Sequence, residues 1–256
     1  MKTVRGAAGP IVVAEHGGGG LPLVLVHGMA GDAGFWGAAM RALGGRHRLV
    51  IPELRGHGRS GPASDGDYSI TACAGDLHAV LDALALERVV LVGHSFGASV
   101  AIELASKLPE RVAALVVVDG AGDFAFVPPE ALLGFLAGLE NETTYAETVE
   151  GAFDVALDGA RPDTERRVRA AVLAAPWPMV RAMYRSLLAY HPTDALDAYP
   201  GPVLLITAPV NAASFALHEL RPALPRQRMD GVSHWVMLDE PTTFARVVEG
   251  FVQGVR

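Results

Sequence analysis

Residues 89–97 read VVLVGHSFG, an apolar run that ends in a single serine between two glycines. The apolar run predicts a buried strand, and the pattern Gly93-x-Ser95-x-Gly97 is typical of a tight turn from a strand into a helix. The residues two before and two after such a serine must be small, because the turn is cramped. The turn lifts the Ser95 hydroxyl clear of the sheet and leaves the Phe96 N–H free to donate, which indicates a catalytic nucleophile.

On both sides of this turn, short apolar runs alternate with helix-like segments, the pattern of a mostly parallel sheet that helices cover on both faces. Strands are predicted at residues 11–15, 22–26, 48–51, 89–92, 113–118, 202–207 and, more weakly, 227–229. Helices are predicted from about residue 70, after a capping Ser69, to residue 86, and over residues 98–107 and 242–252. Glycines 17–20 predict a hairpin connection between the first two strands. The sequence therefore predicts one α/β domain.

The strand pattern disappears between Gly122 and about Asp197, where Ala/Leu-rich helical stretches broken by prolines replace it. We expect a core of residues 1–121 and 198–256, with residues 122–197 inserted as a helical cap over the carboxyl ends of the strands, where ligands bind in such sheets. The candidates for substrate binding in this cap are Trp177, Met183 and Tyr184. The bulky apolar side chains of the cap favour a hydrophobic substrate.

The composition argues against several classes of function. The net charge is −7, from 28 acidic and 21 basic residues without a basic stripe, so nucleic acid is not an expected partner. No apolar run is long enough to span a membrane, and the first fifteen residues lack the apolar core of a signal peptide. Cys73 is the only cysteine, so neither an intrachain disulfide nor a thiolate metal cluster is expected. We predict a soluble, cytoplasmic protein of undetermined oligomeric state.

Two patterns resemble cofactor motifs but lack the context that each motif requires. Residues 56–61 match the dinucleotide fingerprint G-x-G-x-x-G and follow a strand, yet Pro62 and a polar stretch stand where the helix should begin. The pair His218-Glu219 lacks the second histidine, four residues later, that a zinc-binding helix needs. We expect no nucleotide, no metal and no other cofactor.

Four local patterns follow one another along the chain: HGMAG at residues 27–31, ELRGHGRS at 53–60, the serine turn, and GVSHW at 231–235. Together they resemble the α/β-hydrolase superfamily, over nearly the whole chain apart from the cap. The resemblance implies Ser95 as nucleophile, His234 as general base, and the amides of Met29 and Phe96 as the oxyanion hole.

Elementary chemistry agrees with these roles. A serine hydroxyl is a poor nucleophile at neutral pH and needs a base to take its proton, and an imidazole, which titrates near about pH 6.5, can do so. His234 lies on the loop expected after the last strand. The resemblance implies that the loop at residues 53–60 has a structural role, in which Arg55 and Ser60 hold the loop in place. Glu53 stands where members of the family usually have aspartate.

The acid of the triad is missing from its usual position in the family. Members commonly place it after the strand that corresponds to residues 202–207, but here that loop carries Asn211, which cannot stabilise an imidazolium by charge. We predict Asp119 as the acid, because it ends the strand next to the nucleophile strand. Some members, including lactone hydrolases of the zearalenone-degrading type, place their acid there. Asp119 could equally be a turn-forming residue, and Asp123 is a weaker candidate.

The sequence predicts a serine hydrolase that cleaves a carboxylic ester or lactone of a small hydrophobic substrate through an acyl-enzyme. Dehalogenase and epoxide hydrolase chemistry is disfavoured, because those relatives carry aspartate where Ser95 stands. Two alternatives stay open. Asn211 would suit a ligand-binding protein of low activity on the same scaffold, and the triad could also serve a perhydrolase, a hydroxynitrile lyase or an acyl transferase.

Overall fold

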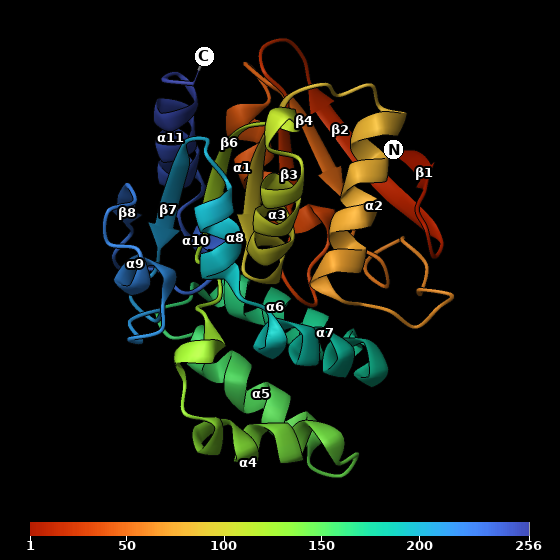
Figure 1. Ribbon diagram of the computed structural model, residues 1–256, viewed down its shortest axis with the longest axis vertical. Coiled ribbons are helices and arrows are strands. Elements are labelled where there is room, and N and C mark those ends of the chain that lie inside the picture. The colour runs from red at the N-terminus through yellow and green to blue at the C-terminus, as the bar shows by residue number, and fades with distance from the viewer. Residues whose placement is uncertain (256) are drawn as a thin grey trace.

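A computed structural model describes residues 1–255, which are built around one eight-stranded sheet (Figure 1). The strands are β1 (Lys2–Arg5), β2 (Pro10–Gly17), β3 (Leu23–Val26), β4 (Arg48–Pro52), β5 (Val89–His94), β6 (Val112–Val118), β7 (Val203–Thr207) and β8 (Arg226–Arg228). Their order across the sheet is β1-β2-β4-β3-β5-β6-β7-β8. Among these strands, β2 alone runs opposite to the other seven, so the β1–β2 and β2–β4 pairs are antiparallel and the other five pairs are parallel. The predicted mostly parallel sheet is confirmed.

Helices cover both faces of this sheet, because successive residues of each central strand point to opposite faces. The α-helices are α1 (Gly37–Leu43), α2 (Ile70–Ala83), α3 (Phe96–Lys107), α4 (Pro129–Glu140), α5 (Tyr145–Ala156), α6 (Pro162–Ala174), α7 (Trp177–Ala189), α8 (Pro192–Ala198), α9 (Leu217–Leu220), α10 (Val236–Asp239) and α11 (Pro241–Val252). The short 3₁₀ helices are η1 (Ala33–Trp36), η2 (Pro109–Arg111) and η3 (Phe124–Phe126). Leu91 packs with α2 and α3, whereas its neighbour Val90 packs with α1 and α11 on the other face.

The predicted hairpin at glycines 17–20 is wrong. β2 pairs with β4 rather than with β3, so β4 lies between the two strands that the glycines connect. The connection therefore spans about 10 Å, twice the spacing of neighbouring strands. Gly17, with φ 71°, lies so close to the backbone of Gly44 and His47 that no side chain would fit. Apolar periodicity identifies a strand but not its partner, and the sequence analysis also did not predict β1.

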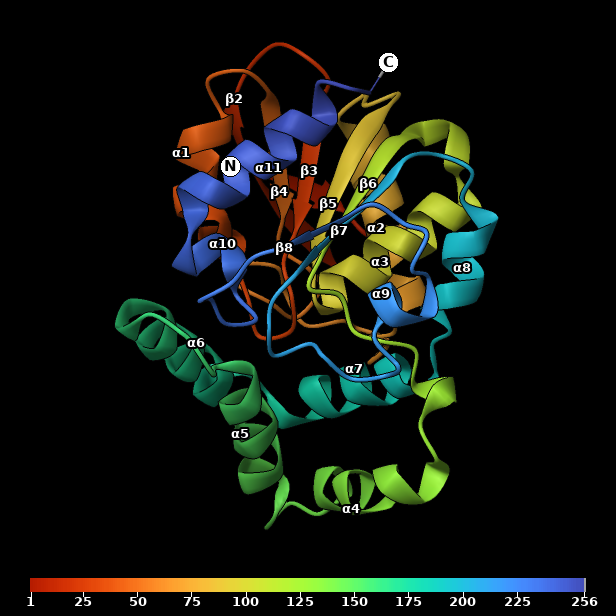
Figure 2. The same cartoon turned by 90° about the vertical axis from the view of Figure 1, so that its left-hand side faces the viewer.

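Helices α4–α7 lie across the carboxyl ends of the strands, between β6 and β7 in the chain (Figure 2). We call residues 124–189 the helical insertion. Arg167 of α6 joins it to the core, through Asp32 at 3.2 Å and through the ring of Phe35, whose centroid lies 4.7 Å from the guanidinium carbon. The N–H of Ile70 also donates to Ser186 Oγ of α7 at 2.9 Å.

The boundaries of core and cap at residues 121/122 and 197/198 remain a prediction. Helix α8, which that division assigns to the cap, packs against α3, and its Leu196 belongs to the buried core. No helix within residues 1–255 is long and apolar enough to cross a membrane.

Candidate active site

Ser95 occupies a strained turn between β5 and α3. Its backbone has φ 53° and ψ −121°, a conformation that L-residues rarely adopt. A Cβ atom on Gly93 would lie 2.4 Å from the carbonyl oxygen of Gly97, and one on Gly97 would lie 2.3 Å from that of His27, so only glycine fits at either position. Phe96 is the first residue of α3, and its N–H therefore has no acceptor within the helix.

Asp119 and His234 are joined by a short hydrogen bond. Asp119 follows β6 and is fully buried, and its Oδ2 lies 2.6 Å from Nδ1 of His234. Its other oxygen accepts a hydrogen bond from the N–H of Ala208 at 2.8 Å. Because Nδ1 donates its proton to the carboxylate, Nε2 of His234 carries a free lone pair and can accept a proton.

Asn211 lies beside this carboxylate rather than replacing it. Its amide nitrogen is 3.4 Å from Oδ1 of Asp119 and donates to the carbonyl oxygen of Gly120 at 2.9 Å. The other aspartate considered, Asp123, accepts hydrogen bonds from Thr193 Oγ1 at 2.5 Å and from the N–H of Ala125. Of the two aspartates, Asp119 is therefore the one hydrogen-bonded to His234.

The loop that carries His234 is held by a second buried carboxylate. Oδ2 of Asp239 accepts from the N–H of Ser233 at 2.8 Å and from its hydroxyl at 2.6 Å. The N–H of His234 itself donates to the carbonyl oxygen of Ala156, at the end of α5, at 3.0 Å. The imidazole is thus positioned from the sheet side and from the helical insertion.

Met29 belongs to a loop that passes directly against the serine. A Cβ atom on Gly28 would lie 3.0 Å from Cβ of Ser95 and 2.9 Å from Nδ1 of His94, so the backbone there needs glycine to come this close. The next residue, Ala30, has φ 57°. The structure therefore brings the amide of Met29 next to the nucleophile turn.

Two buried histidines hold this loop through hydrogen bonds to its backbone. Nδ1 of His27 donates to the carbonyl oxygen of Gly28 at 2.8 Å, while Nε2 accepts from the N–H of Leu54 at 3.0 Å. Nε2 of His57 accepts from the N–H of Ala30 at 3.2 Å. Burial lowers the pKa of His27 to about 4 and that of His57 to about 3, so both rings are neutral acceptors at neutral pH.

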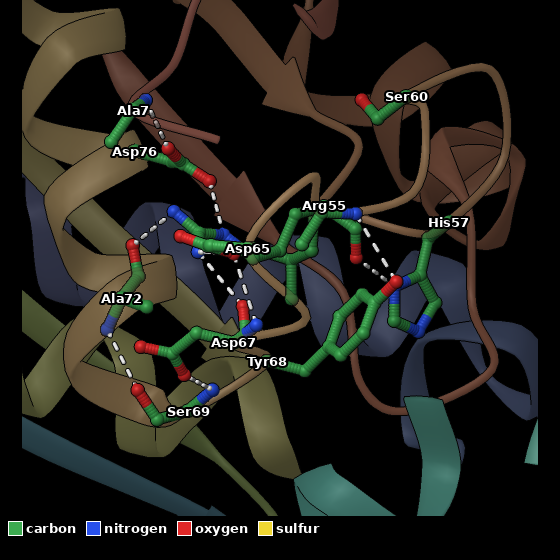
Figure 3. A network of polar contacts seen from close by, with 12 residues as sticks. Ala7, Arg55, His57, Ser60, Asp65, Asp67, Tyr68, Ser69, Ala72 and Asp76 are labelled. Carbon is green, nitrogen blue, oxygen red and sulfur yellow. Dashed lines mark hydrogen bonds and ion pairs between the residues drawn. The ribbon is translucent and has the colours of Figure 1, made fainter. Parts of the chain in front are cut away.

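The loop of residues 53–60 is held by Arg55 and Ser60, as expected from the sequence, and Figure 3 shows the contacts of Arg55. Nε of Arg55 donates to Oδ2 of Asp76 at 2.6 Å, and its two other nitrogens donate to backbone carbonyls of residues 67 and 72. The Ser60 hydroxyl donates to the carbonyl oxygen of Glu53 at 2.6 Å. This network also reaches the loop that carries Met29, because His57, which accepts from the N–H of Ala30, donates through Nδ1 to the carbonyl oxygen of Arg55 at 3.0 Å.

The carboxylate of Glu53 lies against the glycine-rich part of this loop. It pairs with Arg59 at 2.8 Å and also accepts from the N–H of that residue at 2.7 Å. A Cβ atom on Gly58 would lie 2.5 Å from this carboxyl group, which therefore fills the space beside the loop. Within residues 1–255, no three His, Cys, Asp or Glu side chains gather where they could hold a metal ion.

A small cavity of about 80 Å³, here called the catalytic cavity, lies over the serine turn. The residues that line it are Met29, His94, Ser95, Ala152, Phe153, Ala156, Tyr184, Leu187, His234 and Trp235. Of the three substrate-binding candidates, only Tyr184 is among them. Trp177 instead donates to the carbonyl oxygen of Leu139, and Met183 is fully buried in the core.

The sequence analysis missed four of the larger lining residues: His94, Phe153, Leu187 and Trp235. His94 stands inside the serine motif, and its Nε2 donates to the carbonyl oxygen of His234 at 3.0 Å. Burial holds the pKa of His94 well below its usual value. Trp235 follows His234 directly, so both could have been found from their neighbours. Phe153 has no such signal, because nothing in a helical pattern tells which helix faces the serine.

Comparison with known proteins adds to this geometry. A family model described as alpha/beta hydrolase fold matches residues 22–241. The sequence is 43% identical over 106 residues to a protein named putative carbamate hydrolase RutD from Azorhizobium caulinodans, a match that covers 41% of this chain and 40% of that one. The chain thus matches less than half the length of this curated relative.

Two solved structures are similar over almost their whole length. One is described as Est816, an N-acyl homoserine lactone degrading enzyme, with a TM-score of 0.83 and 23% identity, covering 98% of this chain and all of that one. The other is described as an AqdC variant in complex with its substrate, from work on ring cleavage of the Pseudomonas quinolone signal. Its TM-score is 0.87 at 23% identity, with 99% of each chain covered. At these identities the likeness shows the fold alone.

Proposed function

The chain belongs to the alpha/beta hydrolase fold family, and on that basis we propose that it is a serine hydrolase acting on a carboxylic ester or lactone of a small hydrophobic substrate. The observation that carries the proposal is the 2.6 Å contact between Asp119 Oδ2 and His234 Nδ1, with His234 and Ser95 lining one cavity. A buried carboxylate that orients a histidine beside a strained serine is the arrangement that activates a hydroxyl.

In the proposed reaction, Oγ of Ser95 attacks the substrate carbonyl carbon while Nε2 of His234 takes the hydroxyl proton. Asp119 stabilises the imidazolium that results, and the N–H groups of Met29 and Phe96 donate to the oxyanion. Each such donor is typically worth about 3 kcal/mol in the transition state. His234 then gives its proton to the leaving alkoxide, and a water molecule, deprotonated by the same histidine, releases the acid from Ser95.

The lining of the catalytic cavity supports a small uncharged substrate. No Lys, Arg, Asp or Glu is among the lining residues of this cavity, so nothing described there would pair with a charged group. Tyr184, Leu187 and Trp235 supply apolar surface to the lining of this cavity. The names of the similar proteins, a carbamate hydrolase and a lactone-degrading enzyme, are consistent with acyl chemistry. The cytoplasmic location remains a prediction.

The direct test replaces Ser95 by alanine and follows turnover of p-nitrophenyl acetate. We expect a loss of about 10⁴-fold or more in kcat, and labelling by a fluorophosphonate probe in the wild type that disappears in the variant. Ser106→Ala is the matched control, since Ser106 lies at the far end of α3 and donates to the carbonyl oxygen of Glu103.

The outcomes separate the alternatives. Full activity in Ser95→Ala would refute the assignment, and a wild type that the probe does not label would point to the ligand-binding alternative. A triad used for acyl transfer or perhydrolysis would label but pass its acyl group to an added alcohol or peroxide in preference to water.

A further inference from the structure

Phe153 lines two separate cavities. One is the catalytic cavity, and the other is a cavity of about 210 Å³ within the helical insertion, between α5 and α6, here called the outer cavity. The residues that line the outer cavity are Glu150, Phe153, Arg169, Val172 and Leu173. Leu173 is 73% exposed, so the outer cavity opens to solvent. The side chain of Phe153 is therefore a wall that the two cavities share.

The Phe153 ring is held in this position by the loop of the proposed base. It stacks on Trp235, with ring centroids 5.8 Å apart and an angle of 27° between the planes. Trp235 is buried and follows His234 directly, and its ring meets the imidazole edge to face with 5.0 Å between centroids. Stacked aromatic pairs are favourable, so this contact stabilises the Phe153 ring in its place between the two cavities.

The outer cavity is suited to an uncharged, apolar group. Phe153, Val172 and Leu173 give it an apolar surface. The cation among its described lining residues, Arg169, pairs with Asp154 at 2.6 Å and with Glu165 at 2.9 Å, so its charge is already balanced. Glu150 adds a negative charge at the rim, which disfavours anionic ligands. An alkyl chain fits this surface better than a carboxylate or a phosphate.

The volumes of the two cavities indicate that Phe153 limits the space open to a substrate. The catalytic cavity, at about 80 Å³, is well below the roughly 300 to 1,000 Å³ of sites that enclose drug-sized ligands. The cavities of 80 and 210 Å³ together come to about 290 Å³, close to the lower end of that range. Removing the wall would thus turn a site for short substrates into one for longer ones.

We propose that Phe153 sets the upper limit on substrate chain length, and that the outer cavity is an apolar subsite which becomes continuous with the catalytic cavity when this ring is removed. The inference rests on the proposed function, since it concerns esters cleaved at Ser95. The wild type accordingly acts on short, uncharged acyl or alkyl esters. Phe153 determines specificity and takes no part in the bond-breaking step.

The test measures kcat/KM for p-nitrophenyl esters from acetate through butanoate to octanoate. In the wild type, kcat/KM falls beyond butanoate. In Phe153→Ala, the ratio of octanoate to acetate activity rises at least about tenfold, because each methylene that a pocket accepts is worth roughly tenfold or more. Phe153→Trp shifts the ratio the other way. Val155→Ala, a change at a 70% exposed position of the same helix that lines neither cavity, keeps the wild-type profile.

A second variant locates the chain in the outer cavity. Leu173→Trp fills that cavity from its solvent side while Phe153 stays in place, and we expect it to leave the wild-type profile unchanged. Combined with Phe153→Ala, it removes the gain on octanoate. An unchanged chain-length profile in Phe153→Ala would overturn the proposal, and so would a double variant that retains the full gain.

Failure of the proposed function would be visible separately. A wild type that neither cleaves p-nitrophenyl acetate nor reacts with a fluorophosphonate is not a serine hydrolase, whatever Phe153 does. The chain-length limit is then measured as binding of linear aliphatic alcohols, by the change in tryptophan fluorescence. Octanol that binds Phe153→Ala at least about tenfold more tightly than the wild type supports the shared wall, and equal affinity refutes it.

Discussion

The carboxyl edge of the sheet and the helical insertion form opposite walls of the same cavity in different ways. At the sheet edge, Ser95 and Asp119 follow buried strands, and glycines that no other residue could replace bring the backbones together. The insertion is packed less completely. Most of the large apolar side chains exposed within residues 1–255 lie in it: Phe126, Leu133, Val155 and Leu173. The comparison teaches that close backbone packing fixes the positions of Ser95 and Asp119, while the less completely packed helices of the insertion form the opposite wall of the cavity.

The largest effect expected at the sheet edge comes from Asp119→Asn. Without its charge the residue cannot stabilise the imidazolium and can hold the wrong tautomer of His234, a change that costs about 10⁴-fold in kcat in the serine-protease example. Steady-state kinetics on p-nitrophenyl acetate measures it. Asn211→Ala is the matched control, because it removes the 3.4 Å neighbour of the same carboxylate without touching His234, and should cost about tenfold or less. Similar losses in both variants would mean that the acid is not Asp119 alone.

Acid is expected to lower the free energy of unfolding through two buried histidines at the sheet edge. His27 and His57 have pKa values of about 4 and about 3 in the folded protein, below the value near 6.5 of an unfolded chain. From about pH 6.5 downward the unfolded chain therefore binds more protons than the folded one, and stability falls with pH until each folded pKa is reached. Each histidine contributes up to about 1.4 kcal/mol per pH unit over its range.

Urea unfolding at pH 7 and pH 5 measures this loss. His57→Gln, whose amide oxygen can still accept from the N–H of Ala30, should reduce the difference between the two pH values. The helical insertion contains no histidine, so it cannot contribute to this term. Equal unfolding free energies at the two pH values would show that the buried histidines are not the acid-sensitive groups.

The smallest effects come from a matched pair of valines. Val117 is 2% exposed in β6 beneath the site, and Val155 is 70% exposed in α5. Val117→Ala should lower the free energy of unfolding by about 2 kcal/mol, because it leaves a cavity in packed surroundings. Val155→Ala should change it by less than about 0.5 kcal/mol. Chemical denaturation of both variants compares the two regions directly, and equal losses would remove the distinction drawn between them.

The sheet edge was largely predictable from the sequence, because its signals are local. A run of aliphatic residues followed by Gly93-x-Ser95-x-Gly97 specifies a strand, a turn and a helix within nine residues, and the structure has them there. Asp119 could be named because parallel strands end at one edge. The sequence could not show that Asn211 lies next to that carboxylate, since the contact joins residues 92 positions apart.

The strand partners and the cavity wall could not be predicted, because both depend on contacts between distant segments. Short apolar runs identified β2 and β3 but not the position of β4 between them. In the helical insertion, Trp177, Met183 and Tyr184 looked equivalent by size and apolarity. The orientation of the helix determines which of them lines the cavity with Phe153. A sequence pattern identifies the apolar face of a helix but not the residues against which that face packs.

The candidate active site contains residues other than glycine with positive φ, and this backbone conformation lowers the stability of the fold. Ser95, Asp119 and Ala30 are three of the four residues other than glycine with positive φ within residues 1–255. Such conformations cost of order 1–3 kcal/mol each for residues other than glycine. Glycine would relieve that strain at Ser95 and Asp119 but would also remove the side chains on which the proposed function depends. Substitutions that raise thermal stability at these two positions would therefore be expected to abolish the proposed activity.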